Sequence, residues 1–121
     1  MSEHPAQTHK ELEDFIFSLP NTWLDFPFGE EVSVYKIGEK GAADAKMFAL
    51  IQNDSKPVRL SLKCDPSLAE VLREKYETVQ PGYHLNKKQC NTIICSGQLS
   101  EEEVLDFIRH SYQLVAPGVI N

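Results

Sequence analysis

The sequence predicts an α+β domain of two layers, with helices packed on one face of a mostly antiparallel sheet. Two observations support this fold class. Three segments carry apolar residues at helical spacing, and four others have the composition of strands. The predicted order is helix, three strands, helix, strand, helix (α-β-β-β-α-β-α), and short connections between neighbouring strands favour antiparallel pairing.

The first helix is predicted to begin after Thr8. Thr8 and Glu11 have the spacing of a capping box, in which each residue hydrogen-bonds the backbone of the other. Pro20 and Asn21 then end the helix. The apolar residues at helical spacing behind this cap are Leu12, Phe15, Ile16 and Leu19.

Residues 23–29 are predicted to be an aromatic connector, followed by strands at 31–37, 46–52 and 58–63. In the last of these strands, apolar and polar residues alternate, which is typical of a strand with one face against the core. We therefore expect its polar side chains on the sheet face away from the helices. These side chains are Arg59, Ser61 and Lys63.

The second helix is predicted to begin at Asp65 and Pro66, which fit an N-cap and the first helical position. Its expected buried face consists of Leu68, Val71, Leu72 and Tyr76. A fourth strand is predicted at 92–95. The last helix then begins at a second capping box, formed by Ser100 and Glu103.

The length of 121 residues suits one domain with one core. We expect a flexible N-terminus at 1–7, the domain at 8–117 and a C-terminal tail at 118–121. The sequence has no signal peptide pattern and no apolar run that could span a bilayer. Its three cysteines lack CxxC spacing, which fits reduced thiols and a cytoplasmic location.

Charge is distributed unevenly along the chain. The net charge is -6, which argues against a surface covered by nonspecific nucleic-acid contacts. Residues 56–88 nevertheless carry seven basic against four acidic side chains, a local charge of +3. Residues 1–55 and 89–121 carry -6 and -3. Cations are therefore concentrated in the middle of the chain.

The segment 80–92 lies at the end of this basic region and combines a turn, a histidine, amides and two lysines. Polar loops of this kind often carry function. Pro81 and Gly82 suit a turn in which the glycine adopts a positive φ. Lys87 and Lys88 provide the cations that phosphate recognition requires.

Seven segments, in this order along the chain, resemble the MmcQ/YjbR family. They are FPFG at 26–29, VYKI at 34–37, KMFA at 46–49, LSLKCDP at 60–66, PGYHLNKK at 81–88, NTI at 91–93 and SYQLV at 111–115. Together they span roughly residues 10–117. The resemblance implies a frataxin-like α+β fold and a DNA-binding function with a double-wing arrangement. Members of the family usually have Trp before the Asn-Thr pair, where this chain has Cys90.

The resulting hypothesis is a non-enzymatic domain that binds double-stranded DNA weakly and in a salt-sensitive manner. Cations hold the phosphates, while Tyr83 and the amides contact bases or sugars. The residues assigned to nucleic-acid binding are Arg59, Lys63, Tyr83, His84, Asn86, Lys87, Lys88 and Asn91.

Structural roles remain open for several of these residues. Tyr83 could be a half-buried ring at the edge of the core. A histidine without a spaced partner, such as His84, is often structural. Asn86 suits a residue that closes a turn on its own backbone. Lys87 and Lys88 could also be a solvated pair.

The alternative function is a protein- or small-ligand-binding module without DNA binding. It predicts an apolar groove near Trp23, Phe26 and Phe28. A third possibility is acidic metal handling by similarity of fold, although fold alone does not carry function. Its candidate ligands, which also fit a solvated helix face, are Glu11, Glu13 and Asp14.

No catalytic residue, metal site or cofactor is predicted. The sequence has no Walker loop, dinucleotide-binding glycine pattern or nucleophile elbow. His84, Cys90 and Cys95 lack the spacing of a zinc site. A thiolate pair of His84 with either cysteine is also disfavoured, because thiols at an apolar strand are usually inert.

Overall fold

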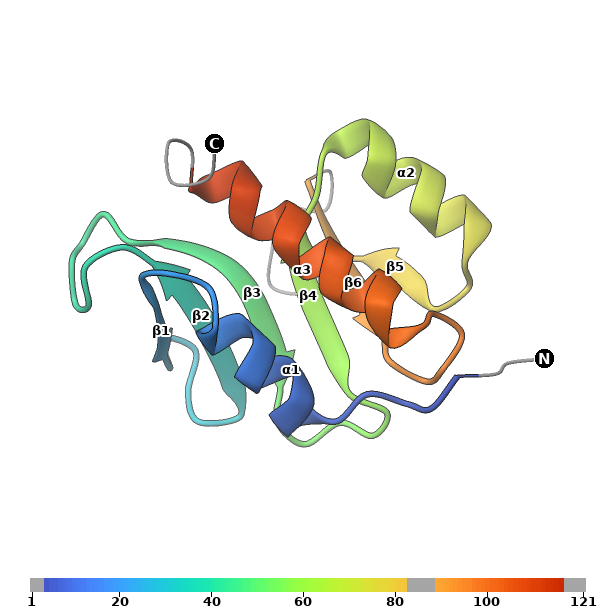
Figure 1. Ribbon diagram of the computed structural model, residues 1–121, viewed down its shortest axis with the longest axis horizontal. Helices are drawn as coiled ribbons and strands as arrows, with labels where there is room; N and C mark the ends of the chain where they lie inside the picture. The colour runs from blue at the N-terminus through green and yellow to red at the C-terminus, as the bar shows by residue number, and fades with distance from the viewer. Residues whose placement is uncertain (1–3, 83–88, 117–121) are drawn as a thin grey trace.

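Three helices cover one face of a six-stranded sheet in the residues that the structure describes (Figure 1). The structure, a computed structural model, describes residues 4–82 and 89–116. The elements in chain order are α1 His9–Phe17, β1 Thr22–Asp25, β2 Val32–Ile37, β3 Lys46–Gln52, β4 Arg59–Lys63, α2 Pro66–Lys75, β5 Val79–Pro81, β6 Cys90–Ile94 and α3 Glu101–Val115. None of these helices has both the length and the apolar character needed to cross a membrane.

The sheet has the strand order β1-β2-β3-β4-β6-β5, and each neighbouring pair is antiparallel. This confirms the predicted two-layer α+β class. Two edge strands, β1 and β5, were not predicted. β1 lies within the residues interpreted as a connector, and β5 contains only three residues and ends in Pro81. Such short strands show no recognisable alternation of polar and apolar residues.

The predicted helix starts are confirmed. The Thr8 hydroxyl accepts a hydrogen bond from Glu11 N at 3.2 Å, and the Glu11 carboxylate accepts one from Thr8 N at 3.0 Å. Ser100 and Glu103 repeat this arrangement at the start of α3, with distances of 3.1 and 2.8 Å. In each helix the cap satisfies backbone N–H groups that lack an intrahelical partner.

The main core lies between the helices and the sheet. Its largest buried rings, Tyr35, Phe48 and Tyr112, are at most 1% exposed, and Phe48 and Tyr112 meet edge to face with centroids 5.5 Å apart. α2 contributes Ala69 and Leu72 to this core. Val71 was expected to be buried but is 56% exposed, because the buried face of α2 consists of Ala69 and Leu72.

The second face of the sheet is not uniformly polar. Ser61 is fully buried, and its hydroxyl shares a hydrogen bond of 2.7 Å with Thr92 on β6. Val34 and Leu50 are also fully buried and belong to a second small apolar cluster. The prediction of an open polar face is therefore wrong at Ser61, which lies in a central strand between Leu50 and Thr92.

Residues 4–7 make contacts that a frayed terminus would not make. His4 N donates to Gly97 O at 3.2 Å, and Gln7 is only 5% exposed. Gly97 has φ +104°, and a Cβ at this position would collide with the His4 carbonyl oxygen. Glycine is therefore required at this turn for both conformation and space.

Candidate functional site

Five of the eight predicted nucleic-acid-binding residues lie outside the described residues. They are Tyr83, His84, Asn86, Lys87 and Lys88. The other three, Arg59, Lys63 and Asn91, lie in β4 and β6.

Asn91 is an interior residue that links α2 to the sheet. Asn91 is only 3% exposed. The Asn91 amide oxygen accepts a hydrogen bond from Arg73 Nε at 2.6 Å, and its amide nitrogen donates to Ala69 O at 3.3 Å. Arg73 also donates to Cys90 O at 2.9 Å. This placement does not fit the expected contact between Asn91 and a base, because the amide is already hydrogen-bonded within the protein.

Arg59 and Lys63 lie at opposite ends of β4. Four residues of strand separate them by about 13 Å. That separation exceeds the screening length of about 8–10 Å at ordinary salt. Charges this far apart act largely independently of each other at ordinary salt.

The end of β4 at Lys63 is separated from β3 by a side chain of α3. Regular pairing between the two strands stops at Ala49 and Leu62. Beyond this point the Ser111 hydroxyl accepts a hydrogen bond from Lys63 N at 2.9 Å and donates one to Phe48 O at 2.6 Å. Figure 1 shows β3 and β4 diverging beneath the last turns of α3. We call this region the open end of the sheet.

A surface hollow of about 340 Å³ lies at the open end. Its walls come from β3, β4, the start of α2, the end of α3 and the residue before β6. The lining residues are Lys46, Lys63, Cys64, Asp65, Pro66, Gln89, Leu114 and Val115. Lys87 and Lys88, which lie outside the described residues, directly precede Gln89 in the sequence.

Lys46 was not among the predicted site residues, although the antiparallel β3–β4 pair brings the start of β3 to the end of β4. Register counting along the two predicted strands could have found it. Within residues 4–82 and 89–116, neither Lys46 nor Lys63 forms an ion pair. Two lysines therefore line the hollow without forming a salt bridge to any described residue, together with the carboxylate of Asp65.

The carboxylate in the hollow, Asp65, already has hydrogen-bond partners. Asp65 Oδ2 accepts from Ser67 N at 3.1 Å and from Leu68 N at 3.2 Å, as expected for the N-cap of α2. The negative charge thus lies against the positive end of the helix dipole.

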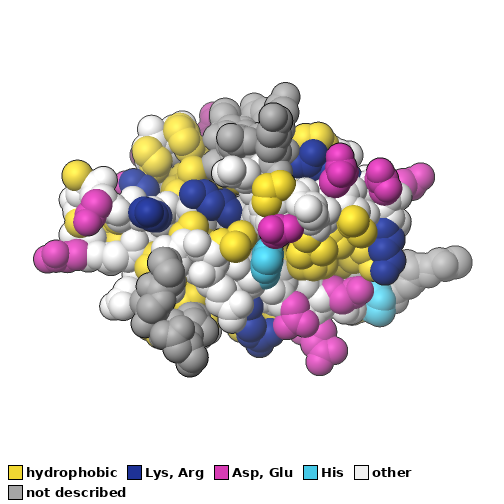
Figure 2. Space-filling view, turned by 90° about the horizontal axis from the view of Figure 1, so that it is seen from above, with side chains coloured by type: hydrophobic (Ala, Val, Ile, Leu, Met, Phe, Trp, Pro, Cys, Tyr) yellow, Lys and Arg dark blue, Asp and Glu magenta, His cyan; other side chains and the backbone are white. Residues whose placement is uncertain are grey.

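The acidic start of α3 is remote from the hollow. Glu101, Glu102 and Glu103 begin α3, whereas Leu114 lies 11–13 residues further along the same helix, about 17–20 Å away. Figure 2 shows a group of Lys and Arg side chains left of centre on the face seen from above, with most Asp and Glu side chains to its right. The charges are therefore unevenly distributed over this face, although the net charge of the chain is -6.

Cys64 and His110 lie close to the hollow but do not form an activated thiolate. His110 Nε2 accepts a hydrogen bond from Asp65 N at 3.2 Å, so this nitrogen is not available as a base. Burial raises the pKa of the Cys64 thiol to about 11, with a further contribution from Asp65. Thiolate chemistry near neutral pH needs a lowered pKa instead.

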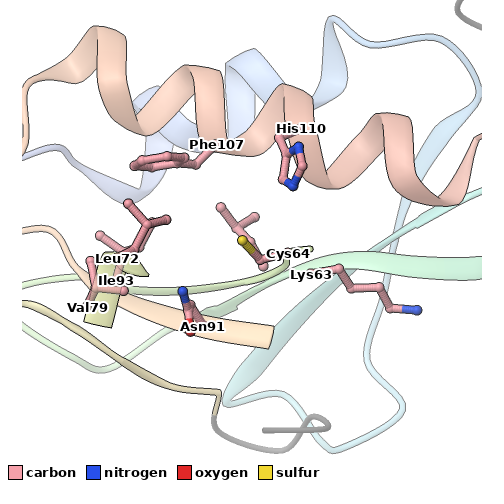
Figure 3. A pocket seen from close by; sticks show the side chains of 9 residues that line it. Lys63, Cys64, Leu72, Val79, Asn91, Ile93, Phe107 and His110 are labelled. Carbon is pink, nitrogen blue, oxygen red and sulfur yellow. The ribbon is translucent and has the colours of Figure 1, made fainter. Parts of the chain in front are cut away.

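The apolar cavity beside Cys64 is too small for a substrate. Its volume of about 10 Å³ is at most that of one water molecule. Figure 3 shows Leu72, Val79 and Ile93 around it, whereas Lys63 extends away from this cluster. The cavity lies beside the hollow and shares Lys63 and Cys64 with it.

The other predicted chemical groups have structural partners. Burial raises the pKa of the Cys95 thiol to about 12. On α1, Glu13 accepts a hydrogen bond of 2.6 Å from the Tyr35 hydroxyl, and Asp14 pairs with Lys10 at 3.0 Å. No group of three or more potential metal ligands occurs in the part of the chain that the structure describes.

Gly82 and Cys90 are close neighbours across the β5–β6 edge. Gly82 does not adopt the positive φ that was predicted for it. Glycine fits there because a Cβ would lie 2.8 Å from the Cys90 Cβ. Cys90 is 2% exposed, which corresponds to a core position rather than to a surface contact.

Two aromatic rings between β1 and β2 are exposed. Phe26 and Phe28 are 44% and 48% exposed. The nearby Trp23 ring stacks with Lys36, whose Nζ lies 5.5 Å from the ring centroid and 2.8 Å from Asp25. These residues form a second candidate surface, at the opposite edge of the sheet from β5.

Comparison with known proteins identifies the family. The sequence pattern of the YjbR family matches residues 17–114, which is most of the chain. The chain belongs to the YjbR family. It is 32% identical to the uncharacterized protein YbdF of Escherichia coli O157:H7 over 111 residues, covering 92% of this chain and 86% of YbdF. It is 34% identical to the uncharacterized protein YjbR of Escherichia coli K12 over 67 residues, covering 55% and 57% of the two chains.

Solved structures show the same YjbR-family fold. A crystal structure of a Deinococcus radiodurans protein with a DUF419 domain superposes with a TM-score of 0.87 at 36% identity, over 99% of this chain and 86% of that one. A Pseudomonas syringae protein superposes with a TM-score of 0.73 at 24% identity, over 89% of this chain and 98% of that one. The second similarity concerns the fold alone.

Proposed function

We propose that this YjbR-family domain is a non-enzymatic nucleic-acid-binding protein that holds phosphates of double-stranded DNA at the open end of its sheet. The supporting observation is the pair Lys46 and Lys63, which line one hollow and form no ion pair within the described residues. Lys87 and Lys88 stand next to Gln89 of this hollow in the sequence and would add two cations. Lysine binds phosphate as a point charge.

The proposed binding is weak and depends on salt. Phosphate neutralisation releases counterions, so each contact steepens the dependence of affinity on salt. The acidic start of α3 lies about 17–20 Å from the hollow, beyond the screening length. We also propose a cytoplasmic location, because Cys64, Cys90 and Cys95 are all free thiols.

Anisotropy of a labelled 20-base-pair duplex at two salt concentrations tests this function. We expect Lys46→Ala/Lys63→Ala and Lys87→Ala/Lys88→Ala each to weaken binding and to reduce the salt slope by about two. Lys10→Ala/Lys75→Ala is the matched control, because it removes the same charge from α1 and from the far end of α2. Equal losses in the control, or binding that ignores salt, would refute the proposal.

The alternative is a protein- or small-ligand-binding module, and the exposed rings of Phe26 and Phe28 favour it. Exposed aromatic rings are common at binding surfaces. This alternative predicts no salt-dependent duplex binding. It also predicts that Phe26→Ser/Phe28→Ser abolishes the fluorescence of a bound apolar dye, while the lysine variants leave that fluorescence unchanged.

A further inference from the structure

The hollow at the open end of the sheet suits the terminal group of a ligand better than the middle of a polymer. We propose that it binds a terminal phosphate monoester, supplied either by a free nucleoside 5′-monophosphate or by the phosphorylated end of a DNA strand. This inference rests on the proposed function, because it names the part of the nucleic acid that Lys46 and Lys63 contact.

The shape of the hollow favours an end group over a continuous backbone. Five segments of the chain contribute its walls, with Asp65 and Pro66 on one helix and Leu114 and Val115 on another. Its volume of about 340 Å³ lies at the lower end of the range for small-molecule sites, about 300–1,000 Å³. A phosphate with its sugar is small enough for such a recess, whereas an internal phosphate carries a nucleotide on each side.

The charges favour a monoester over a diester. A phosphate monoester carries about -1.5 to -2 charges at pH 7, because its second pKa is near 6. Lys46 and Lys63 bring two positive charges to the hollow and Asp65 brings one negative charge. A dianion gains more from this net positive charge than a monoanion does, because the Coulomb attraction grows with the charge of the ligand. Gln89 is exposed at the rim and offers an amide donor to a third phosphate oxygen.

One wall of the hollow is apolar and suits the sugar or base attached to the phosphate. Leu114 is 45% exposed although it lies in the last turn of α3, beside Val115. Pro66 lines the hollow from the start of α2. A sugar or base that extends from the bound phosphate would cover these apolar side chains and gain the free energy of removing them from water.

The test compares ligands that differ only in the terminal phosphate. Duplexes with 5′-phosphate or 5′-hydroxyl ends are measured by anisotropy, and deoxyadenosine 5′-monophosphate, deoxyadenosine and inorganic phosphate by calorimetry. We expect the 5′-phosphorylated duplex to bind about tenfold more tightly than the 5′-hydroxyl duplex. We expect the same ratio between deoxyadenosine 5′-monophosphate and deoxyadenosine. Lys46→Met/Lys63→Met should remove this difference while keeping the apolar stems of both side chains. Lys10→Met/Lys75→Met should preserve it.

A second variant separates the two parts of the site. Leu114→Ser should weaken binding of the nucleotide several-fold and leave binding of inorganic phosphate unchanged. If duplex binds in a salt-dependent manner with no preference for the phosphorylated end, and the nucleotide does not bind, the inference fails and the proposed function stands. If the nucleotide binds through both lysines but no duplex does, the inference stands and the proposed function fails. If neither binds, both are refuted.

Discussion

At each end of the β3–β4 pair, a serine hydroxyl hydrogen-bonds both strands. The two serines come from different parts of the chain. At one end the Ser55 hydroxyl accepts a hydrogen bond from Arg59 N at 3.0 Å and donates one to Gln52 O at 3.3 Å. At the open end the Ser111 hydroxyl makes the corresponding two bonds, to the β4 N–H at 2.9 Å and to the β3 carbonyl at 2.6 Å. Each serine bridges one strand to the other.

The difference lies in where each serine comes from. Ser55 is three and four residues from its partners and belongs to the turn between the strands. Ser111 is 48 and 63 residues from its partners and is held by α3. A local serine bridges the strands at one end, whereas a serine from α3 bridges them at the end where the hollow lies. The candidate site therefore depends on tertiary packing.

The largest expected effect is that of Ser111→Ala. The change removes the partner of one backbone N–H and one C=O at a fully buried position, so the free energy of unfolding should fall by about 2–4 kcal/mol. Urea unfolding followed by circular dichroism measures it. A loss below about 1 kcal/mol would mean that water or a strand shift replaces the bridge at little cost.

At alkaline pH the two ends of the β3–β4 pair should lose similar amounts of stability. Burial raises the pKa of Cys64, at the open end, to about 11 and that of Cys95, beside Val58 at the other end, to about 12. The unfolded thiols ionise near pH 9, so the stability contributed by each neutral thiol is complete below pH 9 and is lost as pH rises toward 11–12.

Each thiol should contribute about 1.5 kcal/mol to the loss of stability between pH 9 and 10.5. Cys64→Ala and Cys95→Ala should each reduce that loss by this amount, measured by urea unfolding at the two pH values. Unequal reductions would show that the two ends differ in burial as well as in hydrogen bonding.

A smaller effect is expected for Ser55→Ala. The hydroxyl of Ser55 is only partly buried, so water can replace it as the partner of Arg59 N. The free energy of unfolding should fall by about 0.5–1.5 kcal/mol, again by urea unfolding. If the loss equals that of Ser111→Ala, the distinction between local and long-range bridging has no energetic basis.

The smallest effect on stability is expected for Lys46→Met/Lys63→Met. Both side chains line the hollow and form no ion pair within residues 4–82 and 89–116, so unfolding should change by no more than about 0.5 kcal/mol. Thermal and urea unfolding check this. A larger loss would indicate that the lysines support the open end itself, and their use for ligand binding would then be harder to isolate.

Local signals explain what the sequence predicted well. The capping boxes at Thr8 and Ser100 and the N-cap at Asp65 depend on contacts within three residues. The strand at 46–52 was predicted with its observed bounds, because it is a nearly continuous apolar run. Each of these features can be recognised in a short window of sequence.

The remaining features depend on neighbours that sequence spacing does not show. Ser61 looks solvent-facing by alternation, but adjacent strands bury it. The Asn91 amide suits a contact with a base edge, but it is already hydrogen-bonded to the Arg73 side chain and to the Ala69 carbonyl. The hollow forms where Ser111 separates two strands, and no residue near Lys63 in the sequence indicates this.

The bridge made by Ser111 also has a consequence for biosynthesis. The N–H of Lys63 is synthesised 48 residues before the hydroxyl that satisfies it. At about 5–20 residues per second, the nascent sheet waits about 2–10 s before α3 can dock against its open end. During that interval the Lys63 N–H and the Phe48 carbonyl lack the serine that joins them in the folded protein.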